Sequence, residues 1–390
     1  MNFSKKTSRT VSTFVMGFTA ILLLASCGSG SSGQPPQRQQ TASQNLIIDT
    51  DMGTDDWLAI AYIAQNLNVN LLGITAVGNG LVPCPDGAFN AEYLLSMSAR
   101  NKAKLVGCGN DWPMDGYASY PISWRQGGIS MLGESMPPRS GQIFPEGATL
   151  LASLLRNAVE PVDVLAIGSL TNIAMVISAE PQLKTKIRRI TSMGGAVNTP
   201  GNLRVHGFTD NHPNAFAEWN FYIDPTAAKI VFESGIPITL VPLDATNGIP
   251  LTSSFIERLR RTKQQPLESF ATRTFDRITG SPGNGEYFHW DPLAAVVAAK
   301  PEICDVMLTK RLTVIADAGS GADKDWGISV GQPIGSFPVL AATGLKRSPL
   351  RASNAGATVE SAAGGLIDVC MHVTPAVFEH EFINTLQSTN

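Results

Sequence analysis

The sequence is poor in charge, and what it lacks excludes several classes of function. Charged residues make up 16% of the 390 residues, the net charge is -3, and no long basic run follows the first ten residues. A nucleic-acid surface needs clustered lysine and arginine, so these features give no electrostatic case for binding DNA or RNA. The five cysteines fit no zinc-binding spacing. Apolar residues nevertheless reach 43%, enough for the core of one large α/β domain or two smaller ones.

The amino-terminal apolar segment, Val11–Leu24, is too short to span a bilayer comfortably. Basic residues precede it and small residues follow it, which is typical of a secretion signal. Its last residues, Leu24-Ala25-Ser26-Cys27, resemble the bacterial lipobox, in which the cysteine becomes the lipidated first residue of the mature protein. We therefore predict a signal peptide over residues 1–26 and lipidation at Cys27. An ordinary signal peptide with an incidental cysteine is the alternative.

Residues 27–44 are rich in Ser, Gly, Gln and Pro without apolar periodicity, which predicts a flexible tether. These features together predict an exported bacterial lipoprotein, held at the periplasmic face or the cell surface through its lipid anchor alone. The four later cysteines can pair in an oxidising compartment or stay free and buried, and the sequence leaves both open. They are Cys84, Cys108, Cys304 and Cys370.

The rest of the chain is organised around the stretch Leu46–Asp56. A short apolar run ends in four aspartates within eight residues, and a helical pattern begins at Trp57, whose side chain we expect in the core. The run predicts a buried strand and the next segment an amphipathic helix. The acids are therefore expected in the strand-to-helix turn, at the edge where open α/β sheets bind ligands.

Four carboxylates this close together repel one another unless some are protonated or a cation neutralises them. An all-oxygen, carboxylate-rich site suits Ca²⁺ or Mg²⁺ rather than zinc. An acidic helix cap is the alternative, but a cap needs only one or two aspartates. The cluster therefore favours a metal site.

An alternation of strand, polar turn and helix recurs from residue 46 to about residue 247. This pattern predicts an α/β fold, with a mostly parallel sheet and helices on both faces. After the first strand, we expect further strands at 69–77, 103–107, 162–167, 187–193 and 238–243, with short candidates at 312–315 and 366–373. Helices are expected at 89–99, 149–158, 173–178 and 293–299, after Asp224-Pro225, and from about residue 375.

Polar residues follow several of these strands. Asn79, Thr171 and Asn247 each come after a strand, so a parallel sheet would bring them to the same edge as the aspartates. Farther along, Glu218 and Asn220 are two residues apart and would face the same way in an extended segment. A Glu and an Asn side by side can accept hydrogen bonds from vicinal hydroxyls and donate hydrogen bonds to them.

Two other segments carry candidate binding groups. Residues 110–146 hold several aromatic residues, many Gly and Pro, and little periodicity, which indicates either a binding loop or a surface Ω-loop. Asp291 stands before a proline at the start of a predicted helix, where it suits an N-cap. His289 and Trp290 precede it, so this helix start is also a candidate site.

These spaced motifs resemble a known family, the inosine-uridine-preferring nucleoside hydrolases. The aspartate cluster Asp49–Asp56 matches first, and the other motifs follow in family order: Val77–Asn79, Gly168–Asn172, Met193–Gly195, Glu218–Asn220, Pro242–Asp244 and Trp290–Pro292. The resemblance implies a Rossmann-like fold, with a mostly parallel β-sheet flanked by helices, over residues 45–390. It also implies hydrolysis of the N-glycosidic bond of ribonucleosides with a tightly bound Ca²⁺.

The resemblance also implies roles for individual residues. The calcium ligands would be Asp51, Asp56, Asp291 and the backbone carbonyl of Ile167, with Asp51 also the general base. The ribose would be held by Asp55, Asn79, Asn202, Glu218, Asn220 and Asp291. A homodimer or homotetramer is implied by the resemblance alone.

Departures from the general pattern point to the purine-specific branch of the family. The pyrimidine-tolerant members carry His directly before the calcium-binding Asp, where this chain has Trp290. Trp219, within Glu-Trp-Asn, and Trp124, before an arginine, also resemble the purine-specific branch. Trp124 and Trp290 would then sandwich the purine, Trp219 is a further candidate for substrate binding, and His289 is a candidate acid for the leaving base.

Three alternatives remain open from the sequence. The first is a hydrolase with broad or pyrimidine preference. The second is a phosphatase of the haloacid-dehalogenase type, which also begins with an apolar strand and Asp-x-Asp but expects Thr or Val where Gly53 stands. The third is a nucleoside-binding lipoprotein without catalysis, which would not need Asp51 as a base.

Overall fold

A computed structural model describes most of the chain after residue 42. The described residues are 43–98, 100, 105–114, 120–139, 141–210, 212, 214–262, 265–280, 286–316 and 354–388. They belong to one compact unit, Thr41–Asn390. The predicted signal peptide, the lipidation site Cys27 and nearly all of the predicted tether lie outside the described residues and stay predictions.

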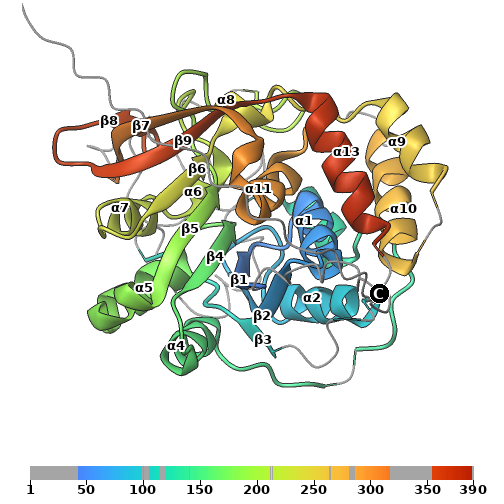
Figure 1. Cartoon of the computed structure of the whole chain (residues 1–390), viewed down its shortest axis with the longest axis horizontal. Helices are drawn as coiled ribbons and strands as arrows, with labels where there is room; N and C mark the ends of the chain where they lie inside the picture. Colours follow the sequence, from blue (N-terminus) through green and yellow to red (C-terminus); the bar gives the residue numbers. More distant parts are fainter. Residues whose placement is uncertain are drawn as a thin grey trace, which may run out of the picture. The chain divides into compact units, whose positions relative to one another are not determined.

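The described residues form one nine-stranded sheet at the centre of this unit (Figure 1). In spatial order the strands are β3 (Leu105–Cys108), β2 (Val69–Ala76), β1 (Gln44–Thr50), β4 (Val162–Ile167), β5 (Ile187–Met193), β6 (Ile238–Val241), β9 (Gly365–Val373), β7 (Cys304–Val314) and β8 (Thr358–Glu360). Seven neighbouring strands run parallel, and the last two pairings, of β9 with β7 and of β7 with β8, are antiparallel. The predicted α/β class with a mostly parallel sheet is confirmed.

Helices cover both faces of the sheet, so the strands are apolar on both sides. Within β1, Leu46 and Ile48 point into one core and Ile47 into the other. The first core packs under α1 (Thr54–Gln65), α2 (Asp86–Ser96), α9 (Ser253–Arg260), α10 (Pro266–Gly280), α11 (Trp290–Ala299) and α13 (Pro375–Leu386). The second packs under α4 (Gly147–Asn157), α5 (Thr171–Ala179) and α7 (Pro225–Phe232).

The direction of the chain across the sheet reverses between β1 and β4. From β1 the chain steps outward to β2 and β3, and it then returns to the other side of β1 as β4, β5 and β6. In open α/β sheets, ligands bind at the carboxyl ends of the two strands that flank such a switch point. A ligand-binding site is therefore expected among the residues that follow β1 and β4.

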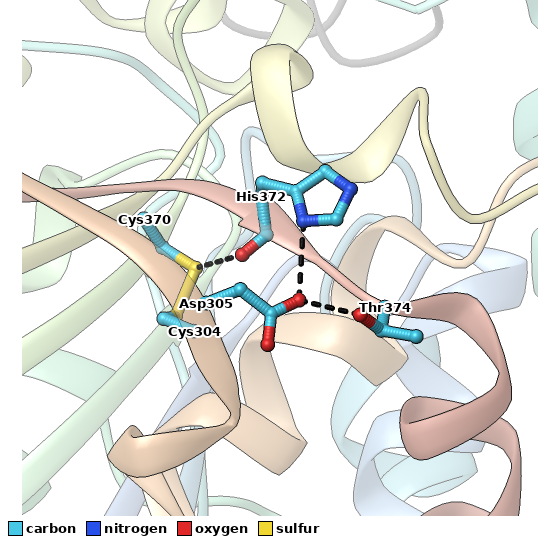
Figure 2. The surroundings of a disulfide bond; sticks show 5 residues. All are labelled: Cys304, Asp305, Cys370, His372 and Thr374. Atoms are coloured by element: carbon cyan, nitrogen blue, oxygen red, sulfur yellow. Dashed lines mark hydrogen bonds and ion pairs between the residues drawn. A yellow bond between two sulfur atoms is a disulfide. The ribbon is translucent and has the colours of Figure 1, made fainter.

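Two disulfides join the cysteines that the sequence left unassigned. Cys84 pairs with Cys108 at the end of β3, and Cys304 pairs with Cys370 between β7 and β9. Figure 2 shows the second disulfide beside Asp305, which accepts hydrogen bonds from Thr374 and from the His372 ring at 2.7 and 3.1 Å. The Cys304–Cys370 disulfide therefore cross-links the antiparallel strands β7 and β9.

Some predicted elements are wrong in their bounds. The first helix begins at Thr54 rather than Trp57, so Asp55 and Asp56 lie in its first turn and not before it. The segment 110–146, predicted without helix, contains α3 (Ile122–Ile129). Short helices also follow Glu218 and β6: α6 (Trp219–Ile223) and α8 (Leu243–Thr246). None of the helices in the described part of the chain is long and apolar enough to cross a membrane.

Candidate active site

The turn between β1 and α1 is held by a dense set of hydrogen bonds. Asp56 Oδ1 accepts from the backbone N–H of Asp51 at 3.1 Å, from that of Met52 at 3.2 Å and from the Thr50 hydroxyl. Met52 adopts a φ of 60°, a left-handed conformation that is rare for a residue with a long side chain. Its carbonyl accepts from the Trp57 indole at 2.9 Å, and Trp57 is fully buried, as predicted. Such local strain is typical of functional sites.

Two glycines let neighbouring loops approach Asp51 closely. A Cβ on Gly80, after β2, would lie 2.2 Å from Asp51 Cβ, and one on Gly168, after β4, would lie 2.6 Å from the Asp51 nitrogen. No side chain fits at either position. Since Thr50 also pairs with Ile167 in the sheet register, the main chain of Ile167 lies beside the turn, where its carbonyl was predicted to bind a metal.

Asp55 and Asp56 meet Asp291, which comes from the first turn of α11 more than 230 residues later. One carboxylate oxygen from each of the three lies within 4.8 Å of the others. Burial raises the pKa of Asp55 to about 6, and it raises the pKa values of Asp56 and Asp291 well above their usual range. Charge repulsion from the neighbouring carboxylates acts in the same direction, whereas a hydrogen bond with Asp291 lowers the pKa values of Asp55 and Asp56.

The side chain of Asp291 does not serve as the helix cap that its position suggested. Its Oδ1 is buried and has no hydrogen-bond partner among the described residues, and His289 occupies the N-cap position instead. A buried carboxylate oxygen without a donor suits a cation. The all-oxygen character of the cluster therefore fits Ca²⁺ or Mg²⁺.

Asp51 is also buried, and burial raises its pKa. Hydrogen bonds act against this effect, among them one from the Gly53 backbone N–H to Asp51 Oδ1 at 3.0 Å. The Tyr120 hydroxyl donates to Asn220 Oδ1 at 3.1 Å, and its interaction with Asp51 also lowers the pKa of that carboxyl group. Tyr120 thus connects the aspartate turn to the predicted ribose-binding residues.

Glu218 and Asn220 face the site from the start of α6. Both Glu218 oxygens accept from the Asn220 backbone N–H at 3.0 Å, and Oε2 also accepts from Gly195 N–H at 3.1 Å. The segment is therefore a capped helix start rather than the extended run expected from the sequence. Burial raises the pKa of Glu218 to about 7. Asn202 joins this group, because its Oδ1 accepts from the Trp219 backbone N–H at 3.1 Å.

The predicted aromatic residues fall into two groups. Trp219 stacks on Tyr120 with ring centroids 5.0 Å apart, and Trp124 meets the edge of Trp219 at 5.7 Å. Trp290 instead packs against Tyr287 at 4.8 Å. The structure therefore places Trp124 with Trp219, and Trp290 with the segment that precedes α11. Trp219 and Trp290 both keep a buried indole N–H without a partner in the described residues.

Sequence reasoning missed two tyrosines at the site. Tyr120 comes from the segment 110–146, where no periodicity marks one aromatic above another. Tyr287 lies 3.4 Å from Asp55 Oδ1 through its hydroxyl. Only the proximity of Tyr287 to Trp290 in the sequence hinted at its role. Asn247, expected at the edge, is exposed beyond α8.

The role of leaving-group acid that we predicted for His289 is not supported by its position. The ring packs against four phenylalanines of the core, with centroids 4.7 to 6.3 Å away: Phe255, Phe275, Phe378 and Phe382. Burial lowers the pKa of His289 to about 3, so the ring is neutral at physiological pH. A ring that points into an apolar core and stays a neutral imidazole is not placed to act as the acid for the leaving base.

We predict that His289→Leu keeps the rate of ribose release within about threefold of the unmodified protein, since general acid catalysis is worth roughly 10²–10⁴-fold and none is lost. Ribose release and thermal unfolding would be measured together. His380→Leu, at an exposed histidine of α13, is the matched control. A hundredfold fall in kcat with unchanged unfolding temperature would restore the acid role.

A family model described as inosine-uridine preferring nucleoside hydrolase matches residues 46–358. The chain belongs to this family. The match spans every motif on which the resemblance was based, from the aspartate turn to Trp290 and Asp291.

Relatives in this family have different base preferences in their names. Nucleoside hydrolase 3 of Arabidopsis thaliana is 29% identical over 322 residues, covering 66% of this chain and 36% of that protein. The pyrimidine-specific ribonucleoside hydrolase RihA of Shewanella sp. strain MR-4 is 33% identical over 228 residues, covering 56% of this chain and 64% of RihA. The chain thus aligns with less than two thirds of the length of either relative.

Solved structures of nucleoside hydrolases share the fold. The purine-preferring ribonucleoside hydrolase of Gardnerella vaginalis has a TM-score of 0.65 at 24% identity and covers 88% of this chain and 98% of its own. The plant nucleoside hydrolase PpNRh1 has a TM-score of 0.66 at 20% identity and covers 89% of this chain and 99% of its own. At these identities the likeness establishes the nucleoside hydrolase fold.

Proposed function

We propose that this protein hydrolyses the N-glycosidic bond of purine ribonucleosides, releasing ribose and the free base, and that it depends on Ca²⁺. The observation that carries the proposal is the meeting of Asp55 and Asp56 with Asp291 beside Asp51 at the switch point of the sheet. Family membership supports the reaction class.

The cation would be held by oxygen ligands only. Asp51, Asp56, Asp291 and the carbonyl of Ile167 are the ligands we assign, with the unpartnered Asp291 Oδ1 the clearest of them. A bound Ca²⁺ would supply positive charge for two ribose hydroxyls and lower the pKa of a bound water.

The residues of the chain have separate tasks in this reaction. Asp51 takes a proton from the attacking water as general base. Glu218, Asn220, Asn202 and Asp55 hold the ribose hydroxyls. The negative charge of the carboxylates among them, and that of Asp51, stabilises the positive charge that builds on the sugar as the bond breaks.

The purine preference rests on the aromatic residues. Trp290 stands directly before Asp291, where a histidine is expected in pyrimidine-tolerant members. The partly buried Trp290 indole offers a broad apolar face, worth on the order of 0.5–1.5 kcal/mol per aromatic pair beyond area burial. That is about tenfold in rate at most, so protonation of the leaving purine must supply the larger part. With His289 in the core, solvent is the proton source we assign.

The test is a ribose-release assay on the purified full chain with saturating Ca²⁺. We expect kcat/KM for inosine, adenosine or guanosine to exceed that for uridine and cytidine by at least tenfold. Faster cleavage of uridine would overturn the purine preference and favour a RihA-like activity. Phosphate release from a phosphoester would instead favour a phosphatase, and tight inosine binding without any free ribose would favour a binding protein.

A further inference from the structure

Four buried polar side chains form a continuous hydrogen-bonded row that runs through Asn79. Ser169, Thr171 and Asp224 complete the row, and each of the four side chains is at most 6% exposed. Thr171 Oγ1 lies 2.7 Å from Asp224 Oδ2 and 2.8 Å from Asn79 Nδ2, and Ser169 Oγ lies 2.7 Å from Asn79 Oδ1. The row joins the turn after β2, the turn from β4 into α5 and the N-cap of α7.

The direction of every bond in the row follows from the carboxylate at one end. Asp224 accepts backbone N–H groups on both oxygens, from Ala227 at 3.0 Å on Oδ1 and from Met114 at 2.8 Å on Oδ2. A carboxylate can only accept, so the single hydroxyl proton of Thr171 goes to Asp224. The Thr171 oxygen then accepts from Asn79 Nδ2. The amide oxygen of Asn79 is left for Ser169, which donates to it.

This row removes the freedom of an asparagine amide to turn over. The amide oxygen of Asn79 is covered by Ser169, whereas Nδ2 carries a second hydrogen that the bond to Thr171 does not use. Asn79 stands next to Gly80, which is pressed against Asp51. Nδ2 therefore keeps one N–H that can be donated to a further acceptor, while Oδ1 is held on the side of Ser169.

We propose that Asp224 and Thr171 are positioning residues that hold Asn79 as a hydrogen-bond donor toward an oxygen of the substrate. This inference rests on the proposed nucleoside hydrolysis. It extends that proposal by giving roles to two residues outside the predicted site and by stating which half of the Asn79 amide meets the substrate.

The sharpest test is Thr171→Val, which keeps the shape of the side chain and removes the hydroxyl. Asp224 keeps its bonds from Ala227 and Met114, so the helix cap stays in place. Asn79 loses its anchor and can turn over, and we expect kcat/KM for inosine to fall about tenfold, the loss of one hydrogen bond of roughly 1.4 kcal/mol. Thr171→Ser keeps a hydroxyl and should stay within about twofold of the unmodified protein.

A double-mutant cycle separates positioning from general structural damage. In an Asn79→Ala background, Thr171→Val should cause no further loss of kcat/KM, because there is no amide left to position. Should the second substitution again cost about tenfold, Thr171 acts independently of Asn79 and the proposal is overturned. Failure of Thr171→Ser to preserve activity would overturn it as well.

A second variant and a separate measurement of ribose release keep the proposal testable if Thr171→Val does not fold or the protein is not a hydrolase. If Thr171→Val does not fold, Ser169→Ala breaks the row from the other side of Asn79 and enters the same cycle. The proposed function is judged separately, by whether the unmodified protein releases ribose at all. If it only binds inosine, the cycle is measured on Kd in place of kcat/KM, with the same expected non-additivity.

Discussion

Asp51→Asn is expected to reduce ribose release from inosine by about 10³-fold or more, because general-base catalysis alone is worth roughly 10²–10⁴-fold. The amide keeps the size of the carboxylate and can still accept the Gly53 N–H, so the turn should form. It cannot take a proton from water. Single-turnover ribose release would show the loss in kcat, while circular dichroism and thermal unfolding report on the fold.

The matched control for this substitution is Asp276→Asn on α10. Asp276 is exposed and paired with Arg260, so its replacement changes charge in the same way without touching the site. Its turnover should stay within twofold of the unmodified protein. An Asp51→Asn variant that retains a tenth or more of the activity would remove Asp51 from the role of base, and the proposed activation of water would fall with it.

Removal of Ca²⁺ by a chelator is expected to abolish turnover and to lower stability in a pH-dependent way. Without the ion, burial holds the pKa of Asp49 at about 7, that of Asp55 at about 6 and that of Glu218 at about 7. In the unfolded chain these groups titrate near 4. Between about pH 4 and pH 7 the folded state thus binds more protons than the unfolded state.

The sign of the effect follows from this difference in bound protons. The free energy of unfolding must decrease as the pH rises through this range, by an amount on the order of several kcal/mol. Calcium binds the ionised carboxylates, so its stabilising effect should grow over the same range. At a calcium concentration of a thousand times Kd the gain is about 4 kcal/mol.

Thermal unfolding from pH 4.5 to 8, with and without Ca²⁺, measures both effects. Mg²⁺ at the same concentration is the control for ion type, since it demands a smaller, octahedral site. If the unfolding temperature of the ion-free protein rises with pH, the expected sign is contradicted. The charge of the buried acids must then be neutralised by something other than added Ca²⁺. Full activity in excess chelator would exclude a role for the metal in turnover.

The sequence predicted the parts of the fold that depend on local pattern. The parallel strands and α13 follow from apolar runs and turn signals, and the aspartate turn was found because four acids in eight residues exceed what a helix cap needs. Asp291 was placed with Asp55 and Asp56 only through family resemblance. Their contact joins segments more than 230 residues apart, which periodicity does not encode.

The parts that could not be predicted depend on tertiary packing. His289 lies beside Asp291 in the sequence, yet the helix start turns its ring into a core of phenylalanines. Tyr120 reaches Asp51 from a segment without periodicity, and the row from Asp224 to Asn79 needs three elements to meet. Such side-chain directions are set by neighbours far apart in the sequence, so they appear only in the folded chain.

The two disulfides carry a practical consequence for anyone who produces this protein. Cross-links of this kind persist outside the reducing cytosol, and the amino-terminal segment independently predicts export. Cys84 lies in the loop between β2 and α2, and Cys108 ends β3, so this disulfide ties to β3 the loop that also carries Gly80, the glycine close to Asp51. Recombinant protein made in a reducing host, or assayed with dithiothreitol in the buffer, would lack both disulfides. Its stability and turnover would then differ from those of the disulfide-bonded protein.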